Sequence, residues 1–147
     1  MTSSTSSPSV VTWLGYGGLI PFVVLALANV FEPTYAITWT RALLGYGAVI
    51  LSFVGALHWG FAMAHPQLQD RAHHALYIWS VVPSLLGWVA LLMVPKAGAT
   101  LLIAGLLAHY RQDLRLSRVV SLPGWYLPMR LRLTVLACLC LAALFAA

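Results

Sequence analysis

The residues best able to do chemistry in this sequence lie inside apolar segments. His58, followed by Trp59 and Gly60, interrupts the apolar run SFVGALHWGFAMA at residues 52–64. A polar ring without a partner is costly in hydrocarbon, and such residues usually face the interior of a helix bundle or a water-filled cavity. Three roles for His58 stay open: a hydrogen bond that fixes helix packing, a contact to a ligand or proton, and ligation of a metal or haem.

Aromatic and hydroxyl residues in the same part of the chain could form a lipophilic pocket with His58. Apolar pockets with a few polar anchors are typical of sites for hydrophobic small molecules. A neutral imidazole offers one donor and one acceptor, which suits a quinone carbonyl or a lipid ester better than an anion. We therefore expect ligand contacts from a set of seven residues: His58, Trp59, Tyr77, Trp79, Ser80, Trp125 and Tyr126.

Haem held between His58 and His109 is the lesser alternative, because the two histidines lie at different depths in their apolar segments. The sequence contains no nucleophile elbow, Walker loop, dinucleotide fingerprint or zincin helix. We therefore predict no catalytic residue and no metal site, which favours a protein that is not an enzyme.

Asp113 stands between two arginines at the end of the fourth apolar segment. The simpler role for it is a local ion pair with Arg111 or Arg115 at the level of the lipid headgroups. The alternative is a carboxylate that pairs across the bundle with Arg130 or His58. In either case we expect a rim at the headgroups that consists of Arg111, Asp113, Arg115 and Arg130.

The composition requires a membrane to position these residues. Of the 147 residues, 61% are hydrophobic and 7% are charged, whereas soluble domains are about 25% charged. Five apolar stretches are each near the roughly 20 residues that cross a bilayer. The sequence thus predicts an all-α membrane protein, with a disordered tail (1–10) and a single five-helix transmembrane domain (11–147), its helices at about 11–31, 41–64, 74–94, 97–111 and 131–147.

Lysine and arginine are unevenly divided between the two sides of this bundle. Six lie on the side of the N-terminus and two on the other, which places the N-terminus inside and the C-terminus outside. This topology also brings His58, Tyr77, Trp79 and His109 to the inner end of the bundle. We expect a multi-pass protein of the bacterial inner (cytoplasmic) membrane, whose net charge of +5 reflects topology and lipid contact rather than nucleic acid.

The second apolar segment is the expected centre of the bundle. Small residues at a spacing of four allow a neighbouring helix to approach closely. His58 projects from the opposite face, with Gly47, Leu51, Val54 and Ala62, so packing is expected on both faces. The residues expected to serve helix packing are Ala48, Ser52, Ala56, Gly60 and, from the third segment, Pro83.

Four stretches carry a resemblance to a known family: GYGGLIPF (15–22), LLGYGAVILSFVGALHWG (43–60), YIWSVVPSLLGW (77–88) and LPGWYLPMRLRLT (122–134). The chain resembles the small inner-membrane proteins related to transmembrane protein 69, grouped under domain of unknown function 3429. The resemblance implies a five-helix membrane protein but no function. Two hypotheses stay open: binding of a hydrophobic small molecule (quinone, lipid or tetrapyrrole) in a cytoplasmic-side pocket around His58, or service as an assembly or accessory subunit of a larger inner-membrane complex.

Overall fold

A computed structural model describes residues 9–146 of the chain, and within them every regular element is a helix. The expected tail at residues 1–10 lies outside the described residues, except for Ser9 and Val10, which are helical. The α-helices are α1 (Ser9–Gly17), α2 (Ile20–Phe31), α3 (Ala36–Ala64), α4 (Asp70–Leu92), α5 (Pro95–Leu116) and α6 (Tyr126–Ala142), and the short 3-10 helices are η1 (Pro33–Tyr35) and η2 (Ala143–Phe145).

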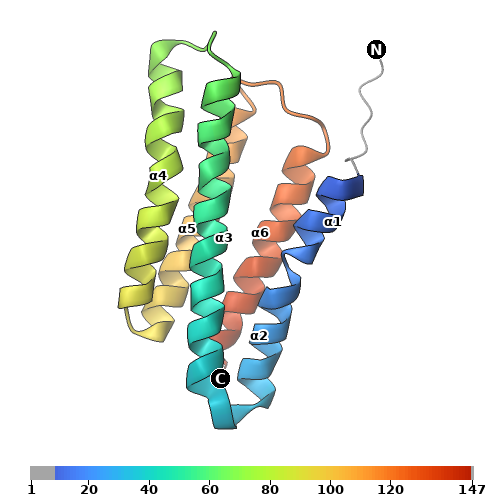
Figure 1. Ribbon diagram of the computed structural model, residues 1–147, viewed down its shortest axis with the longest axis vertical. Helices are drawn as coiled ribbons and strands as arrows, with labels where there is room; N and C mark the ends of the chain where they lie inside the picture. The colour runs from blue at the N-terminus through green and yellow to red at the C-terminus, as the bar shows by residue number, and fades with distance from the viewer. Residues whose placement is uncertain (1–8, 147) are drawn as a thin grey trace.

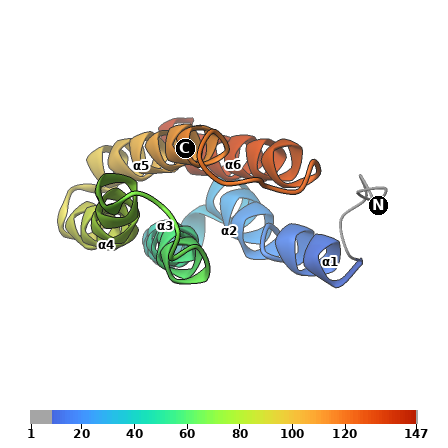
Figure 2. The ribbon, with the colours of Figure 1, turned by 90° about the horizontal axis from the view of Figure 1, so that it is seen from above.

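The helices form two layers. Viewed from above, α1, α2, α3 and α4 lie side by side in one layer, and α5 and α6 form the second (Figure 2). All of them follow the long axis of the molecule, and α1 begins at the end opposite to where η2 finishes (Figure 1). Helix α3 contacts α2, α4, α5 and α6.

Four helical stretches are long and apolar enough to cross a membrane: Ser9–Phe31, Pro33–Ala64, Asp70–Leu92 and Tyr126–Phe145. Helix α5 is not among them. It has 22 residues, but its last two turns carry five polar and charged side chains: His109, Arg111, Gln112, Asp113 and Arg115. The protein is therefore a helical membrane protein. Its least apolar helix, α5, lies in the second layer with α6 (Figure 2).

Two helix boundaries differ from expectation in a way that affects the site. Helix α5 continues to Leu116 and so includes Asp113, which the sequence interpretation placed beyond its end. Helix α6 begins at Tyr126 rather than at residue 131, so Arg130 is a helical residue and not part of a loop. Pro128 is compatible with this earlier start, because a proline in the first turn of a helix removes no intrahelical hydrogen bond.

The first membrane helix is interrupted between α1 and α2. Gly18 and Leu19 form a turn, and Pro21 stands at the start of α2, where its missing N–H costs nothing. The hydroxyl group of Tyr46 donates a hydrogen bond of 2.8 Å to the carbonyl oxygen of Gly18. A side chain of α3 thus satisfies a backbone group that the break leaves free, as the bilayer requires.

Close packing between α3 and α4 occurs at two glycines. A Cβ atom at Gly55 would lie 2.8 Å from Cβ and Cγ of Pro83, and one at Gly87 would lie 3.1 Å from the carbonyl oxygen of Ala48. Ala48 and Pro83, both expected to serve helix packing, therefore lie at these close approaches. The predicted row of small packing residues does not include Gly60, because a Cβ atom there would meet nothing within 4 Å.

Helix α3 is buried on one face only. Its buried residues include Gly47, Leu51, Val54, His58 and Ala62, the face predicted for His58. Ala56 and Gly60 on the opposite face are exposed, and Ser52 is half-buried, its hydroxyl donating to the carbonyl oxygen of Ala48. Packing on both faces was thus wrong: α3 sits in the outer row between α2 and α4, and no helix covers its outer side (Figure 2).

Candidate functional site: a buried polar cluster beside an apolar cavity

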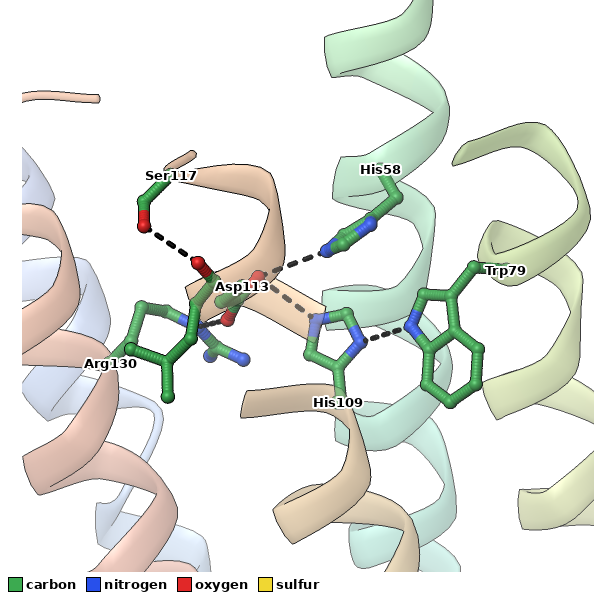
Figure 3. A network of polar contacts seen from close by, with 7 residues as sticks. His58, Trp79, His109, Asp113, Ser117 and Arg130 are labelled. Carbon is green, nitrogen blue, oxygen red and sulfur yellow. Dashed lines mark hydrogen bonds and ion pairs between the residues drawn. The ribbon is translucent and has the colours of Figure 1, made fainter. Parts of the chain in front are cut away.

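Polar side chains from four helices meet at one end of the bundle. His58 comes from the last turns of α3, Trp79 from α4, His109 and Asp113 from α5, and Arg130 from the start of α6 (Figure 3). His58, His109 and Asp113 are at most 1% exposed, and Arg130 is 8% exposed. The expected convergence of chemically capable residues at one end is therefore present, and we call these five residues the polar cluster.

Asp113 is the centre of the polar cluster. Its Oδ1 atom accepts a hydrogen bond of 3.0 Å from Nε2 of His58, and its Oδ2 atom accepts one of 2.9 Å from Nε of Arg130. Nε2 of His109, one helical turn earlier on α5, lies 3.6 Å from Oδ1. The carboxylate thereby joins α3, α5 and α6, and the preferred interpretation of a local pair with Arg111 or Arg115 was wrong.

Trp79 determines which nitrogen of His109 carries the proton. The indole Nε1–H donates a hydrogen bond of 3.0 Å to Nδ1 of His109 (Figure 3). An indole N–H can only donate, so Nδ1 must be an acceptor and the ring proton must be on Nε2. His109 is consequently neutral, and its Nε2–H points towards the Asp113 carboxylate.

The charges of the polar cluster balance. Asp113 contributes one negative charge and Arg130 one positive charge, joined by a charge-assisted hydrogen bond. Asp113 and Arg130 therefore neutralise each other inside the bundle. Such balance allows the buried group to be tolerated in a low-dielectric interior.

Several polar atoms in and beside the cluster lack a partner. Buried atoms without a hydrogen bond include Nδ1 of His58, Nε2 of His109, the hydroxyl of Tyr126 and Nη2 of Arg130. Buried polar groups are nearly always satisfied by protein, water or a ligand. Unsatisfied groups at this density, in one place, distinguish this end of the bundle from the rest of the described chain.

The set of His58, His109 and Asp113 resembles a metal site, since three ligand atoms lie within 4.8 Å of one another. The hydrogen bond from Trp79 argues against it. A metal on Nε2 of His109 would force the ring proton onto Nδ1, where it would face the indole N–H. The positive charge of Arg130 on the same carboxylate opposes a cation further. The residues therefore do not fit a metal ion.

Haem does not fit between the two histidines either. The rings of His58 and His109 touch edge to face, with their centroids 4.8 Å apart and an interplanar angle of 61°. Bis-histidine ligation requires the macrocycle to lie between the two rings. Here the Asp113 carboxylate oxygen occupies the space that both Nε2 atoms face.

A cavity of about 530 Å³ lies beside the polar cluster, between α1, α2, α3 and α6. Its wall is mostly apolar, with contributions from Phe22 and Phe53. The polar residues that line it come from α6 and the residue before it: Trp125, Tyr126, Arg130 and Thr134. Arg130 therefore belongs both to the polar cluster and to the cavity wall.

The expected ligand residues divide into three groups. Trp125 and Tyr126 line the cavity. His58 and Trp79 belong to the polar cluster instead. The remaining three do neither: Trp59 is 48% exposed with its ring against Tyr77 at 4.8 Å, and the Ser80 hydroxyl donates to the Tyr77 carbonyl oxygen. A pocket centred on His58 was therefore wrong; the cavity lies one side chain further, behind Arg130.

The expected rim at the headgroups is also only partly correct. Arg111 and Arg115 are exposed on α5, as a rim requires. Asp113 is fully buried and Arg130 nearly so, because each neutralises the other inside the bundle.

Helical periodicity could have revealed the buried position of Asp113. The buried residues of α5 follow a spacing of three and four through Leu102, Leu106, His109, Asp113 and Leu116. Asp113 continues this apolar stripe, and arginines two residues to either side fall on the opposite face. The signal in the sequence was thus a charged residue at a position that continues a buried apolar stripe. The neighbouring arginines drew attention away from it, because they suggested a local ion pair.

Comparison with known proteins gives a family but no activity. The family described as "Protein of unknown function (DUF3429)" matches residues 7–146. Transmembrane protein 69 of Xenopus tropicalis is 36% identical over 138 residues, covering 89% of this chain and 51% of that protein. Transmembrane protein 69 of Mus musculus is 28% identical over 141 residues, covering 93% of this chain and 56% of that protein. The chain thus spans about half the length of these relatives, and no solved structure matches it.

Proposed function

Because this chain belongs to the DUF3429 family, whose description names no activity, we propose from its geometry that it binds a hydrophobic small molecule inside the membrane. The ligand occupies the cavity between α1, α2, α3 and α6, with the polar cluster at its side. In the topology we propose, the chain crosses the membrane five times: α5 crosses in addition to the four apolar stretches. The N-terminus lies inside, and the membrane is the bacterial inner membrane.

The observation that carries this proposal is the cavity itself. Its volume of about 530 Å³ lies within the range of about 300–1,000 Å³ that ligand pockets occupy. An apolar wall with a few buried donors at one place is the usual form of a site for a lipophilic molecule. Gly15 contributes to this form, because a Cβ atom there would collide with the side chain of Met129 in the wall.

A substitution that fills the cavity tests the proposal. Leu133 lines the cavity from α6, whereas Leu136 on the same helix is 40% exposed and does not line it. The wild-type protein, Leu133→Trp and Leu136→Trp are purified into lipid nanodiscs, and co-purified quinones and lipids are measured by mass spectrometry. We expect an enriched molecule with the wild type and Leu136→Trp, and its loss with Leu133→Trp.

Equal enrichment in all three proteins would contradict a ligand in this cavity. Stoichiometric recovery of another membrane protein, without an enriched small molecule, would favour the alternative of an accessory subunit. That alternative assigns the polar cluster to helix packing alone.

A further inference from the structure

We infer that the molecule bound in the cavity is electrically neutral and carries a carbonyl oxygen, which accepts hydrogen bonds from Arg130 and Tyr126. This inference rests on the proposed function and adds the chemical class of the ligand. A quinone ring and an acyl ester both present such an oxygen, and the experiment below separates them.

Donors without acceptors mark where the polar part of the ligand lies. Arg130 uses Nε for Asp113, and its Nη2 is buried without a partner. The hydroxyl of Tyr126 is also buried and has no hydrogen bond of regular geometry, although it lies close to the Asp113 carboxylate, and both residues line the cavity. Since a guanidinium group has donors and no acceptor, the matching ligand atom is an acceptor such as a carbonyl oxygen.

The charge balance of the polar cluster decides between a neutral and an anionic headgroup. The positive charge of Arg130 is already neutralised by Asp113, whose Oδ2 lies 2.9 Å from Nε. A carboxylate ligand would add a second negative charge beside Asp113 without another buried arginine, because the other arginines of this end are all exposed: Arg71, Arg111, Arg115, Arg118 and Arg132. Burying an uncompensated charge is far more costly than burying a hydrogen-bonded carbonyl group.

The tyrosine ring is held in place independently of its hydroxyl. The ring of Tyr126 packs edge to face on Phe61, with centroids 5.9 Å apart, and lies 6.1 Å from the ring of Trp125. Tyr126→Phe therefore removes the donor and keeps the packing. Tyr35, which is 61% exposed in η1, provides the matched control Tyr35→Phe.

The experiment is a fluorescence titration in zwitterionic nanodiscs. Decylubiquinone quenches tryptophan fluorescence and serves as the probe, because Trp125 forms part of the cavity wall. Methyl decanoate, decanoate at pH 8 and decane compete with it; they share a chain and differ in headgroup. Tyr126→Phe and Tyr35→Phe are titrated beside the wild type, and Leu133→Trp reports whether quenching depends on the cavity.

We expect saturable quenching by decylubiquinone that Leu133→Trp abolishes. Loss of one hydrogen bond should weaken binding in Tyr126→Phe by about three- to tenfold and leave Tyr35→Phe unchanged. Methyl decanoate should displace the probe at concentrations about tenfold lower than decane or decanoate. If decylubiquinone shows no saturable quenching but an acyl ester co-purifies with the wild type and is lost from Leu133→Trp, the acyl ester is the source of the carbonyl group and the inference is supported.

The inference and the proposed function fail in different ways. Decane competing as well as the ester, decanoate competing better than the ester, or unchanged affinity in Tyr126→Phe would overturn the neutral carbonyl ligand while leaving a cavity ligand. Binding that persists in Leu133→Trp would overturn the cavity ligand itself.

Discussion

Removing both charges of the Asp113–Arg130 pair should cost much less than the sum of the two single removals. Asp113→Asn leaves the guanidinium group of Arg130 buried, at 8% exposure, with no anion beside it. Breaking a buried pair in this way costs about 3–5 kcal/mol in the free energy of unfolding. Asparagine retains a carbonyl oxygen for the His58 donor, so the loss concerns the charge more than the hydrogen bond.

Arg130→Met should cost less, about 2 kcal/mol. The carboxylate that remains keeps its 3.0 Å hydrogen bond from His58 and can be neutralised by a proton, whereas a guanidinium group cannot lose its charge. In the double variant neither charge remains. Since replacing a whole buried pair is often neutral, we expect the double variant to lose no more than about 2 kcal/mol, against a sum of about 6 kcal/mol for the single variants.

The assay is unfolding of the four proteins by SDS in mixed micelles, followed by tryptophan fluorescence. The free energy of unfolding of each protein gives the coupling between the two positions. A double variant that loses the full sum would show no coupling, and the assignment of Asp113 and Arg130 as a mutually neutralising pair would be refuted.

Two further predictions concern packing and the tautomer of His109. Gly55→Ala should lower the free energy of unfolding by about 1–3 kcal/mol, because its Cβ would lie 2.8 Å from Pro83; Gly60→Ala, with no atom within 4 Å, should be neutral or stabilising by up to about 1 kcal/mol. Equal stability of the two variants would contradict the described α3–α4 interface. Trp79→Phe should lower the free energy of unfolding by about 1–2 kcal/mol, because Nδ1 of His109 loses its donor. Zinc should leave the unfolding midpoint of the wild type unchanged. Stabilisation of the wild type by zinc would instead show that His109 can release its Nε2 proton to a metal.

Much of the helical layout follows from the sequence because hydrophobic length and proline position are local properties. The apolar runs predict the helices, and the buried face of α3 follows from the 100° step between residues, which places His58 with Leu51 and Ala62. The match to the DUF3429 family also follows from contiguous motifs.

The contacts that make the site are not local, so the sequence favoured a local ion pair for Asp113 and named pairing with Arg130 or His58 as the alternative. The partners of Asp113 lie 17 and 55 residues away in the sequence. Two arginines within two residues of Asp113 offered a simpler pairing, although the helical spacing of three and four places them on the opposite face of α5. The cavity lies beside the break at Gly18 and Leu19, and no local pattern in the sequence specifies how α1 is placed relative to α3 and α6.

The position of Asp113 also constrains the order in which the protein can be built. During synthesis α5 emerges before α6, and α5 is not apolar enough to be counted among the membrane-crossing helices. Its buried carboxylate has no cationic partner until Arg130, 17 residues later, has left the ribosome. In the five-crossing topology, α5 therefore cannot settle in the lipid by itself and must enter together with α6. The last two helices form one insertion unit, and an error in α6 would strand α5 at the membrane surface.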